Sequence, residues 1–300
     1  MAKFLDDNGL AYLWSKIKAT IPKSVNPNIL DNWYFGNPVN QRNQTEYTSA
    51  AYTIDRWKKT SATGVFSVES DGCVLSNPST ATAAAQLTQY IDEAITGTVI
   101  FSVLVDGSLH SISADIATGA THGVPFGTLR IGKSSSTGKA FVQITVNAGV
   151  STMLVAAKLE LGDTQTIAHQ DSSGAWVLNE IPNYGEQLAR CQRYYVRYTA
   201  EHNGASWFSQ GSAISATSVR FVINLPQSLR KGVNAAVENG NLRLLNISAN
   251  TSAEFTALSA YNTTGNIVYI AATTSGFTTG NVAVLQAKAT GAYLAFNCDL

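Results

Sequence analysis

The stretch TVIFSVLVDGSLHSISADI, residues 98–116, decides the fold class. Its first part, residues 98–105, is apolar and rich in β-branched side chains, which favours a strand. Asp106 and Gly107 then form a dipeptide typical of the turn in a β-hairpin. Residues 109–116 return from that turn as a second strand. We therefore predict antiparallel β-structure here and search for further strands on both sides.

Alternating apolar and polar residues recur along the rest of the chain. Residues 140–149 alternate, and residues 152–162 place Lys158 and Glu160 on one face, where the two charges can pair. The opposite, apolar face of that strand holds Val155, Ala157, Leu159 and Leu161. Further strands are predicted at residues 219–226, 241–249, 266–273, 281–289 and 292–300. Strands of this length with Gly, Asn and Ser turns are typical of an antiparallel sandwich or jelly roll.

The N-terminal segment is the only clear helix in the pattern. Leu10, Trp14, Ile17 and Ile21 recur at helical spacing, and Pro22 ends the helix. Two heptads are too short to be stable alone in water. We expect this helix to pack on copies of itself or on a larger assembly; the alternative is that it caps the following domain.

These patterns predict a mainly β protein in three parts. They are a short N-terminal α-helix (1–25), an antiparallel, jelly-roll-like β-sandwich (26–180) and a β-rich C-terminal head (181–300). The segment EQLARCQRYYVRY (186–198) is predicted to join the last two, with a helical turn followed by strand alternation from Tyr194. We expect its arginines to pair with Glu186 of a neighbouring copy.

Composition excludes several classes of protein. The 300 residues carry no net charge, so there is no basic excess for binding nucleic acid. No apolar run approaches the ~20 residues that span a bilayer, so membrane insertion is not expected. The N-terminus lacks the features of a signal peptide, which predicts synthesis in a cytoplasm. Cys73, Cys191 and Cys298 are far apart and odd in number, which predicts buried thiols.

Three stretches, taken in order, resemble a known family. They are FLDDNGLAYLWSKIK (4–18), then NPNILDNWYFGNPVNQR (26–42) with YTIDRWK (52–58), and finally AAKLELGDTQTIA (156–168) with EQLARCQRYY (186–195). Together they are similar to tail-fibre or receptor-binding proteins of phages and prophages of Gram-positive and gut bacteria, over roughly residues 1–200.

The resemblance implies a homotrimer in the virion tail, held to tail or baseplate proteins by the N-terminal helix. It also implies a middle sandwich like a carbohydrate-binding module, a head at the fibre tip, and a bacterial surface polysaccharide or other glycan as ligand. No cofactor is implied. A structural calcium ion is suggested only by analogy with carbohydrate-binding modules. No acidic cluster in this sequence supports such an ion.

Sugar binding needs flat aromatic faces beside hydrogen-bonding groups. In the middle module the candidates are Trp33, Tyr34, Trp57 and Tyr90, with the alternative that both tryptophans belong to the core. In the head the candidates are Trp207, Phe208, Tyr261 and Phe277, which lie in Gly-, Ser- and Thr-rich stretches predicted to be loops. The head loops are the preferred site.

Catalysis is not expected, because the sequence has no GxSxG, HExxH or P-loop motif. A His202–Cys191 dyad and pairs among the scattered acids are no more than chance combinations. We expect a non-catalytic receptor-binding protein. The alternatives are a structural baseplate or decoration protein and, less favoured, a depolymerase of cell-wall polysaccharide.

Overall fold

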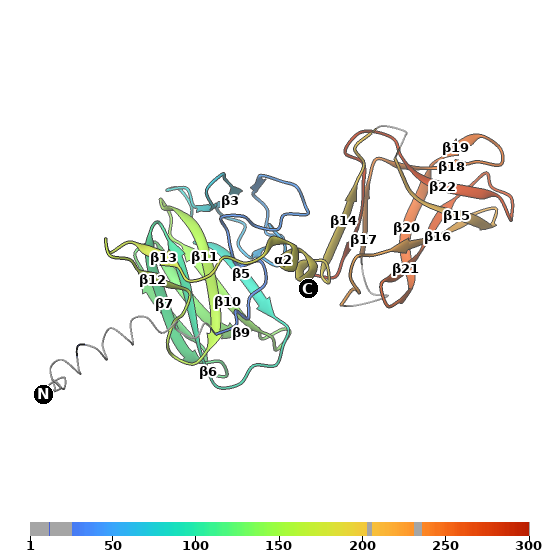
Figure 1. Cartoon of the computed structure of the whole chain (residues 1–300). Helices are drawn as coiled ribbons and strands as arrows, with labels where there is room; N and C mark the ends of the chain where they lie inside the picture. Colours follow the sequence, from blue (N-terminus) through green and yellow to red (C-terminus); the bar gives the residue numbers. More distant parts are fainter. Residues whose placement is uncertain (1–11, 13–25, 203–205, 231–235, 300) are drawn as a thin grey trace, which may run out of the picture.

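The computed structural model describes residue 12, residues 26–202, residues 206–230 and residues 236–299. The chain is mainly β, with 51% strand and 3% helix, as predicted, and all its sheets are antiparallel (Figure 1). The predicted N-terminal helix, residues 1–25, lies outside the described residues apart from Tyr12. No helix in the described part of the chain is long and apolar enough to cross a bilayer.

The first unit consists of two sheets around one hydrophobic core. The six-stranded sheet has the order β1 (Glu46–Tyr47), β3 (Val65–Val68), β4 (Cys73–Ser76), β11 (Ser151–Leu161), β6 (Thr98–Val105) and β7 (Ser108–Asp115). The five-stranded sheet has the order β2 (Lys58–Lys59), β5 (Ala85–Ile91), β10 (Ala140–Val146), β9 (Gly127–Lys133) and β8 (Ala120–Val124). A separate hairpin pairs β12 (Ala168–Gln170) with β13 (Trp176–Leu178).

The hairpin that decides the fold class forms as predicted. Strands β6 and β7 pair over their whole length, and the turn residues Asp106 and Gly107 have φ of 47° and 72°. Positive φ at both positions is what a type I′ turn requires, and glycine adopts it without strain.

Strand β11 departs from its predicted pattern at two places. A register shift between Leu154 and Ala156 interrupts the alternation, and Leu161 at the end of the strand is 56% exposed. Lys158 and Glu160 pair as predicted, with Nζ 3.6 Å from Oε2. Both side chains are inaccessible to solvent, because residues 166 and 180 cover that face.

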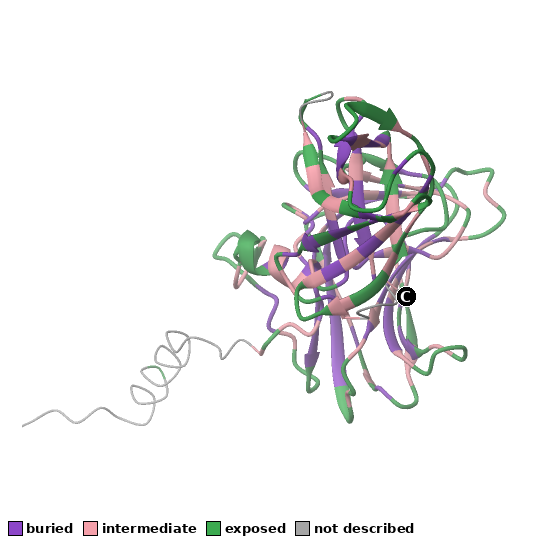
Figure 2. Cartoon of the chain, turned by 90° about the vertical axis from the view of Figure 1, so that its right-hand side faces the viewer, coloured by how far each residue is buried: buried purple, intermediate pink, exposed green. Residues whose placement is uncertain are grey.

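The head contains a second hydrophobic core between two further sheets (Figure 1). The three-stranded sheet has the order β14 (Tyr195–Thr199), β23 (Tyr293–Asn297) and β17 (Ala236–Gly240). The seven-stranded sheet has the order β19 (Thr251–Ala253), β18 (Leu242–Asn246), β22 (Val282–Ala287), β15 (Trp207–Ser215), β16 (Ser218–Asn224), β21 (Ile267–Thr274) and β20 (Phe255–Thr264). Figure 2 shows buried residues on the strands that enclose the core, and exposed residues both in the connections and along several strands of the head.

The C-terminal strand lies in this second core. Leu294, Phe296 and Cys298 are completely buried and belong to this core, as predicted; Ala295 between them is also completely buried but lies outside the core cluster, and Leu300 lies outside the described residues. The other two cysteines, Cys73 and Cys191, are also buried thiols, as expected.

The segment between the two units forms the predicted helix-to-strand junction. Helix α2 (Tyr184–Cys191) begins after Asn183, whose side chain accepts a hydrogen bond from the Glu186 amide, and β14 follows. The expected pairing of its arginines with Glu186 involves a neighbouring copy and stays a prediction. Arg190 pairs with Asp31 of the same chain, with Nε 2.7 Å from Oδ1, and Arg197 donates to the Arg42 carbonyl at 2.8 Å.

Candidate functional site

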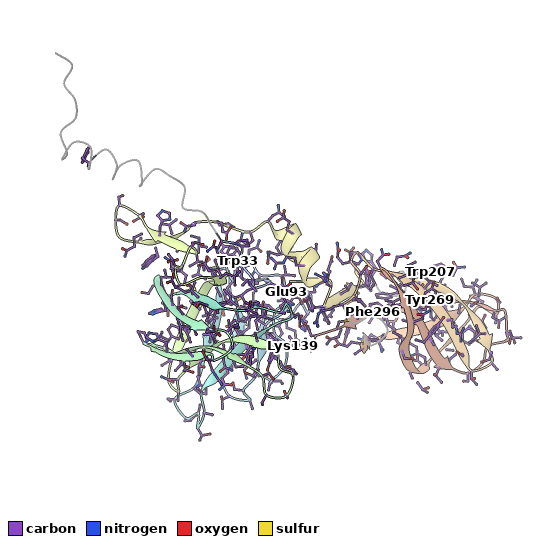
Figure 3. All side chains as sticks on the ribbon, turned by 90° about the horizontal axis from the view of Figure 1, so that it is seen from below. Trp33, Glu93, Lys139, Trp207, Tyr269 and Phe296 are labelled. Atoms are coloured by element: carbon purple, nitrogen blue, oxygen red, sulfur yellow. The ribbon has the colours of Figure 1, made fainter. Side chains whose placement is uncertain are left out.

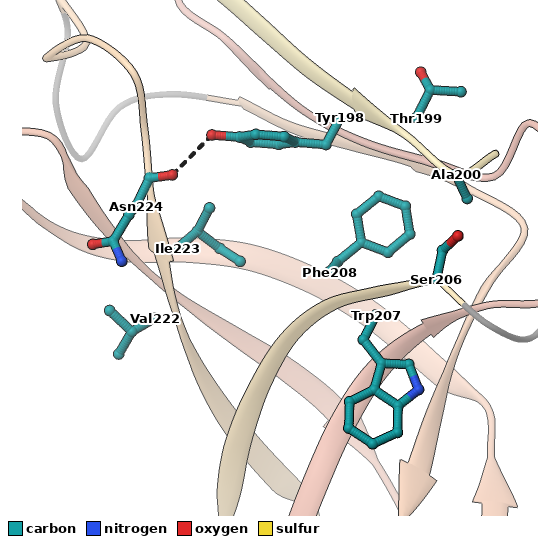
Figure 4. Close-up of a pocket in the computed structure, with 9 residues that line it drawn as sticks. All are labelled: Tyr198, Thr199, Ala200, Ser206, Trp207, Phe208, Val222, Ile223 and Asn224. Atoms are coloured by element: carbon teal, nitrogen blue, oxygen red, sulfur yellow. Dashed lines mark hydrogen bonds between the residues drawn. The ribbon is translucent and has the colours of Figure 1, made fainter. Parts of the chain in front are cut away.

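A cavity of about 420 Å³ opens beside the start of β15 in the head (Figure 4). It is lined by Tyr198, Thr199, Ala200, Ser206, Trp207, Phe208, Val222, Ile223 and Asn224. Of the described residues that line it, none is charged. The cavity therefore offers aromatic and aliphatic surface together with hydroxyl and amide groups, which is the usual composition of a small-molecule site.

The two consecutive aromatic residues at this cavity serve different purposes. Successive side chains on a strand point to opposite faces of the sheet. Phe208 packs against the core of the head, whereas Trp207 is 56% exposed (Figure 4). Trp207 is thus the ring that is open to a ligand.

Further exposed side chains extend from Trp207 across the sheet. Val222 on β16 lies between the inward-facing Phe221 and Ile223, so it points outward, and it is 46% exposed. It pairs with Tyr269 on β21, whose ring centroid lies 6.1 Å from that of Tyr261 on β20. Together with Trp207, these three residues define what we call the aromatic face: Trp207, Val222, Tyr269 and Tyr261.

Hydrogen-bonding groups surround the aromatic face. Gln286 pairs with Trp207 across β15 and β22, and its Oε1 accepts a hydrogen bond from Arg243 Nε at 3.0 Å. On the cavity side, the Tyr198 hydroxyl donates to the Asn224 carbonyl at 2.8 Å, which fixes one wall (Figure 4). An exposed ring, which can stack on an apolar surface, and amide groups, which can bond hydroxyls, thus lie close together.

Three of the candidate aromatic residues lie in the cores. Trp33, Trp57 and Phe277 are between 0% and 5% exposed, and Trp57 Nε1 donates to the Asn32 carbonyl at 2.9 Å. A buried ring has no free face for a sugar, so these three leave the candidate site. The alternative reading of both tryptophans as core residues agrees with their burial.

The other two candidates of the first unit are half-buried. Tyr34 makes an edge contact with Trp33, and Tyr90 makes one with Phe141. Both belong to the first unit. Figure 3 shows Trp33 of that unit well apart from Trp207 and Tyr269 of the head. Of the head candidates, Trp207 and Phe208 line one cavity, whereas Tyr261 lies on the same sheet three strands away from β15.

The predicted loops of the head are largely strands. Trp207 and Phe208 begin β15, and Tyr261 lies within β20 at a register shift, so the assignment of these residues to loops was wrong. Backbone pairing with β22 and β21 extends through these Ser- and Thr-rich stretches. The sequence also missed Val222 and Tyr269; the alternation of residues 219–225 contains the signal that Val222 faces outward.

Several residues that were considered for catalysis are buried or paired with cations. Cys191 is buried, and burial raises the pKa of its thiol well above the ordinary value. Glu180 and Asp92 form ion pairs with Lys158 and Lys139. Within the part of the chain that the structure describes, no group of three His, Cys, Asp or Glu side chains is arranged to hold a metal ion.

No protein-family model matches the sequence, and no curated protein sequence matches it significantly.

Proposed function

We propose that this chain is the non-catalytic receptor-binding subunit of a phage tail fibre, and that the head attaches the virion to a bacterial surface glycan through the aromatic face. In this proposal residues 26–180 are a jelly-roll-like sandwich resembling a carbohydrate-binding module. The N-terminal helix joins three copies and holds them to tail or baseplate proteins. The protein is made in the host cytoplasm and works in the virion tail.

The observation that carries the proposal is the exposure of Trp207 beside an uncharged cavity. A large ring that is 56% exposed beside a 46% exposed valine places apolar area in water, which a binding partner would remove. Repeating the face in each copy of a trimer would multiply a modest affinity for one sugar unit into firm attachment.

The direct test is binding to host cells and to a glycan array by the purified oligomer. Trp207→Ala is expected to weaken binding about tenfold or more per site, since stacking and burial of the ring are lost. Tyr184→Ala is the matched control, because that ring is 45% exposed on α2 and is no part of the aromatic face.

Retention of full binding by Trp207→Ala, with host adsorption that does not need residues 200–300, would contradict the proposal. If the chain is instead a structural baseplate or decoration protein, Trp207→Ala would impair assembly into the virion. Neither the wild type nor the variant would then bind a glycan. The exposed sheet face gives that alternative its one supporting observation, because a protein partner would also cover it.

A further inference from the structure

We propose that the aromatic face selects an acidic polysaccharide, whose carboxylate or phosphate groups are bound by Arg220 and Arg243. This inference rests on the proposed function, since it names the chemical class of the glycan. Its basis is the position of the two arginines, their ion pairing and the charge of the surrounding face.

Arg220 lies on the same face of the sheet as Val222. It is on β16 between Val219 and Phe221, which both point into the core, so its side chain points outward. Its guanidinium carbon lies 4.7 Å from the centroid of the Tyr261 ring. Stacking on the ring orients the planar guanidinium while leaving its N–H groups at the edge for a ligand.

Arg243 lies on the other side of Trp207. It is on β18 between the inward-facing Leu242 and Leu244, and it pairs with Gln286, which in turn pairs with Trp207. Its Nε–H is bonded to Gln286, which holds the side chain over the sheet. The two arginines therefore lie on opposite sides of β15, Arg243 in line with Trp207 and Arg220 beside Ser212 further along the strand.

Neither arginine is neutralised within the described part of the chain. The ion pairs found there engage other arginines: Arg42, Arg56, Arg190 and Arg230 all bind aspartates. Arg220 and Arg243 are in none of them. A chain with no net charge thus keeps two unpaired guanidinium groups on one face.

The face contains no acid at its outward positions. On the four central strands, alternation with the core residues assigns these positions to Trp207, Gln210, Ser212, Arg220, Val222, Asn224, Ile267, Tyr269, Ala271, Thr273, Val282, Val284 and Gln286. Glu254, just before β20, is paired with Lys288 at 2.5 Å. The local charge is positive, and it complements an anion.

The spacing fits a polymer with rings between its charges. From β18, which carries Arg243, to β16, which carries Arg220, the sheet is crossed in three strand steps, about 14 Å at the usual strand separation, which is longer than a single sugar ring. Guanidinium groups form paired hydrogen bonds with carboxylate or phosphate oxygens. Nucleic acid is a poor fit, because two arginines on a neutral chain give little counterion release.

The test compares three defined polymers: a neutral glucan, a polymer of uronic acids, and a poly(glycerol phosphate). Binding is measured by calorimetry or biolayer interferometry at low and high sodium chloride. The wild-type protein is expected to bind one or both acidic polymers at least about tenfold more tightly than the glucan, with affinity that falls as salt rises. Preference for the uronic acids identifies the carboxylate as the recognised group, and preference for the other identifies the phosphate.

Two variants and a control make the assignment specific. Arg220→Gln and Arg243→Gln are each expected to reduce binding of the acidic polymer about threefold to tenfold and to flatten the salt dependence. Lys133→Gln, an exposed cation on β9 of the first unit, is expected to change neither. Circular dichroism and melting of each variant establish that it is folded.

Tighter or equal binding of the neutral glucan, without salt dependence, would overturn the inference and leave the proposed function standing. Loss of the acidic preference in Lys133→Gln would also overturn it. If no polymer or host cell binds and Trp207→Ala changes nothing, the proposed function itself fails.

Discussion

Arg42 and Asp299 lie 257 positions apart in the chain and form an ion pair, with Nη2 2.7 Å from Oδ2. The second terminal nitrogen of Arg42 lies 3.0 Å from Asp55 Oδ1. The guanidinium also lies 4.0 Å from the centroid of the Tyr195 ring. Arg42 and Asp55 belong to the first unit, whereas Tyr195 and Asp299 belong to the head. This cluster, which we call the joint, therefore connects the two units through buried charges.

At pH 8, where Asp55 is ionised, Arg42→Ala is expected to lower the free energy of unfolding by about 3 kcal/mol, because it removes the cation that the buried Asp55 and Asp299 share and leaves Asp299 only the more distant Arg56. Chemical denaturation with tryptophan fluorescence measures the change. The matched control is Lys133→Ala, which removes an exposed cation and should stay within about 0.5 kcal/mol of the wild type. Equal stabilities for the two variants would show that the joint contributes nothing.

The sequence predicts local structure well because local patterns determine it. The Asp106-Gly107 turn and the alternation of Leu294, Phe296 and Cys298 are visible in neighbouring residues and form as predicted. The joint is different, since nothing near Arg42 in the sequence indicates that its partner is residue 299. Such pairing depends on how the two units pack.

The aromatic face was predicted only in part for the same reason. Trp207 was singled out as an exposed ring, but Ser and Gly nearby made its segment resemble a loop. It is a strand because β22 supplies hydrogen-bonding partners from far along the chain. The alternation of side chains along β16 and β21 places Val222 and Tyr269 on the same face of the seven-stranded sheet. Only the packing of the three-stranded sheet decides which face of that sheet is covered.

Lys158→Ala should destabilise the first unit by about 3 kcal/mol, because Glu160 would keep a buried charge without its cation. Glu160 also accepts hydrogen bonds from the amide and hydroxyl of Thr166, at 2.7 and 2.6 Å. The double variant Lys158→Met with Glu160→Gln should recover most of the loss, since it removes both charges and keeps an acceptor. Thermal melting of the two variants tests this; a double variant as unstable as Lys158→Ala would refute the explanation.

Gly211→Ala is expected to destabilise the head by about 2 kcal/mol. A Cβ at this position would meet the Arg220 carbonyl oxygen at 2.0 Å and the Phe221 ring at 2.7 Å, so β15 and β16 would have to separate. Gly123→Ala is the control, because its Cβ would have no atom within 4 Å and its φ is not positive. Hydrogen exchange should show faster opening of β15 and β16 in the first variant and no change in the second.

The joint also predicts how stability depends on pH. The pKa of Asp55 is raised to about 7. Burial is the largest cause, and the negative charge of Asp299 acts in the same direction, whereas Arg42 and the Gln41 side chain lower the pKa. The folded state then holds a proton that the unfolded chain, with the ordinary value of 3.8, gives up. The stabilising contribution of this proton is fully present below pH 3.8 and is lost as the pH rises through 7.

We therefore expect the free energy of unfolding of the wild type, relative to Asp55→Asn, to fall by about 2 kcal/mol between pH 5 and pH 8. The amide of the variant cannot ionise, so its profile lacks this decline. Asp92 does not affect the measurement. Burial raises its pKa, but the hydrogen bond from Lys139 and the charge of Arg56 outweigh burial and lower the pKa overall, so its contribution changes only in acid below the window. Urea denaturation at several pH values gives both curves. Parallel curves across the window would mean that Asp55 stays ionised in the folded joint and that Arg42 outweighs the cost of its burial.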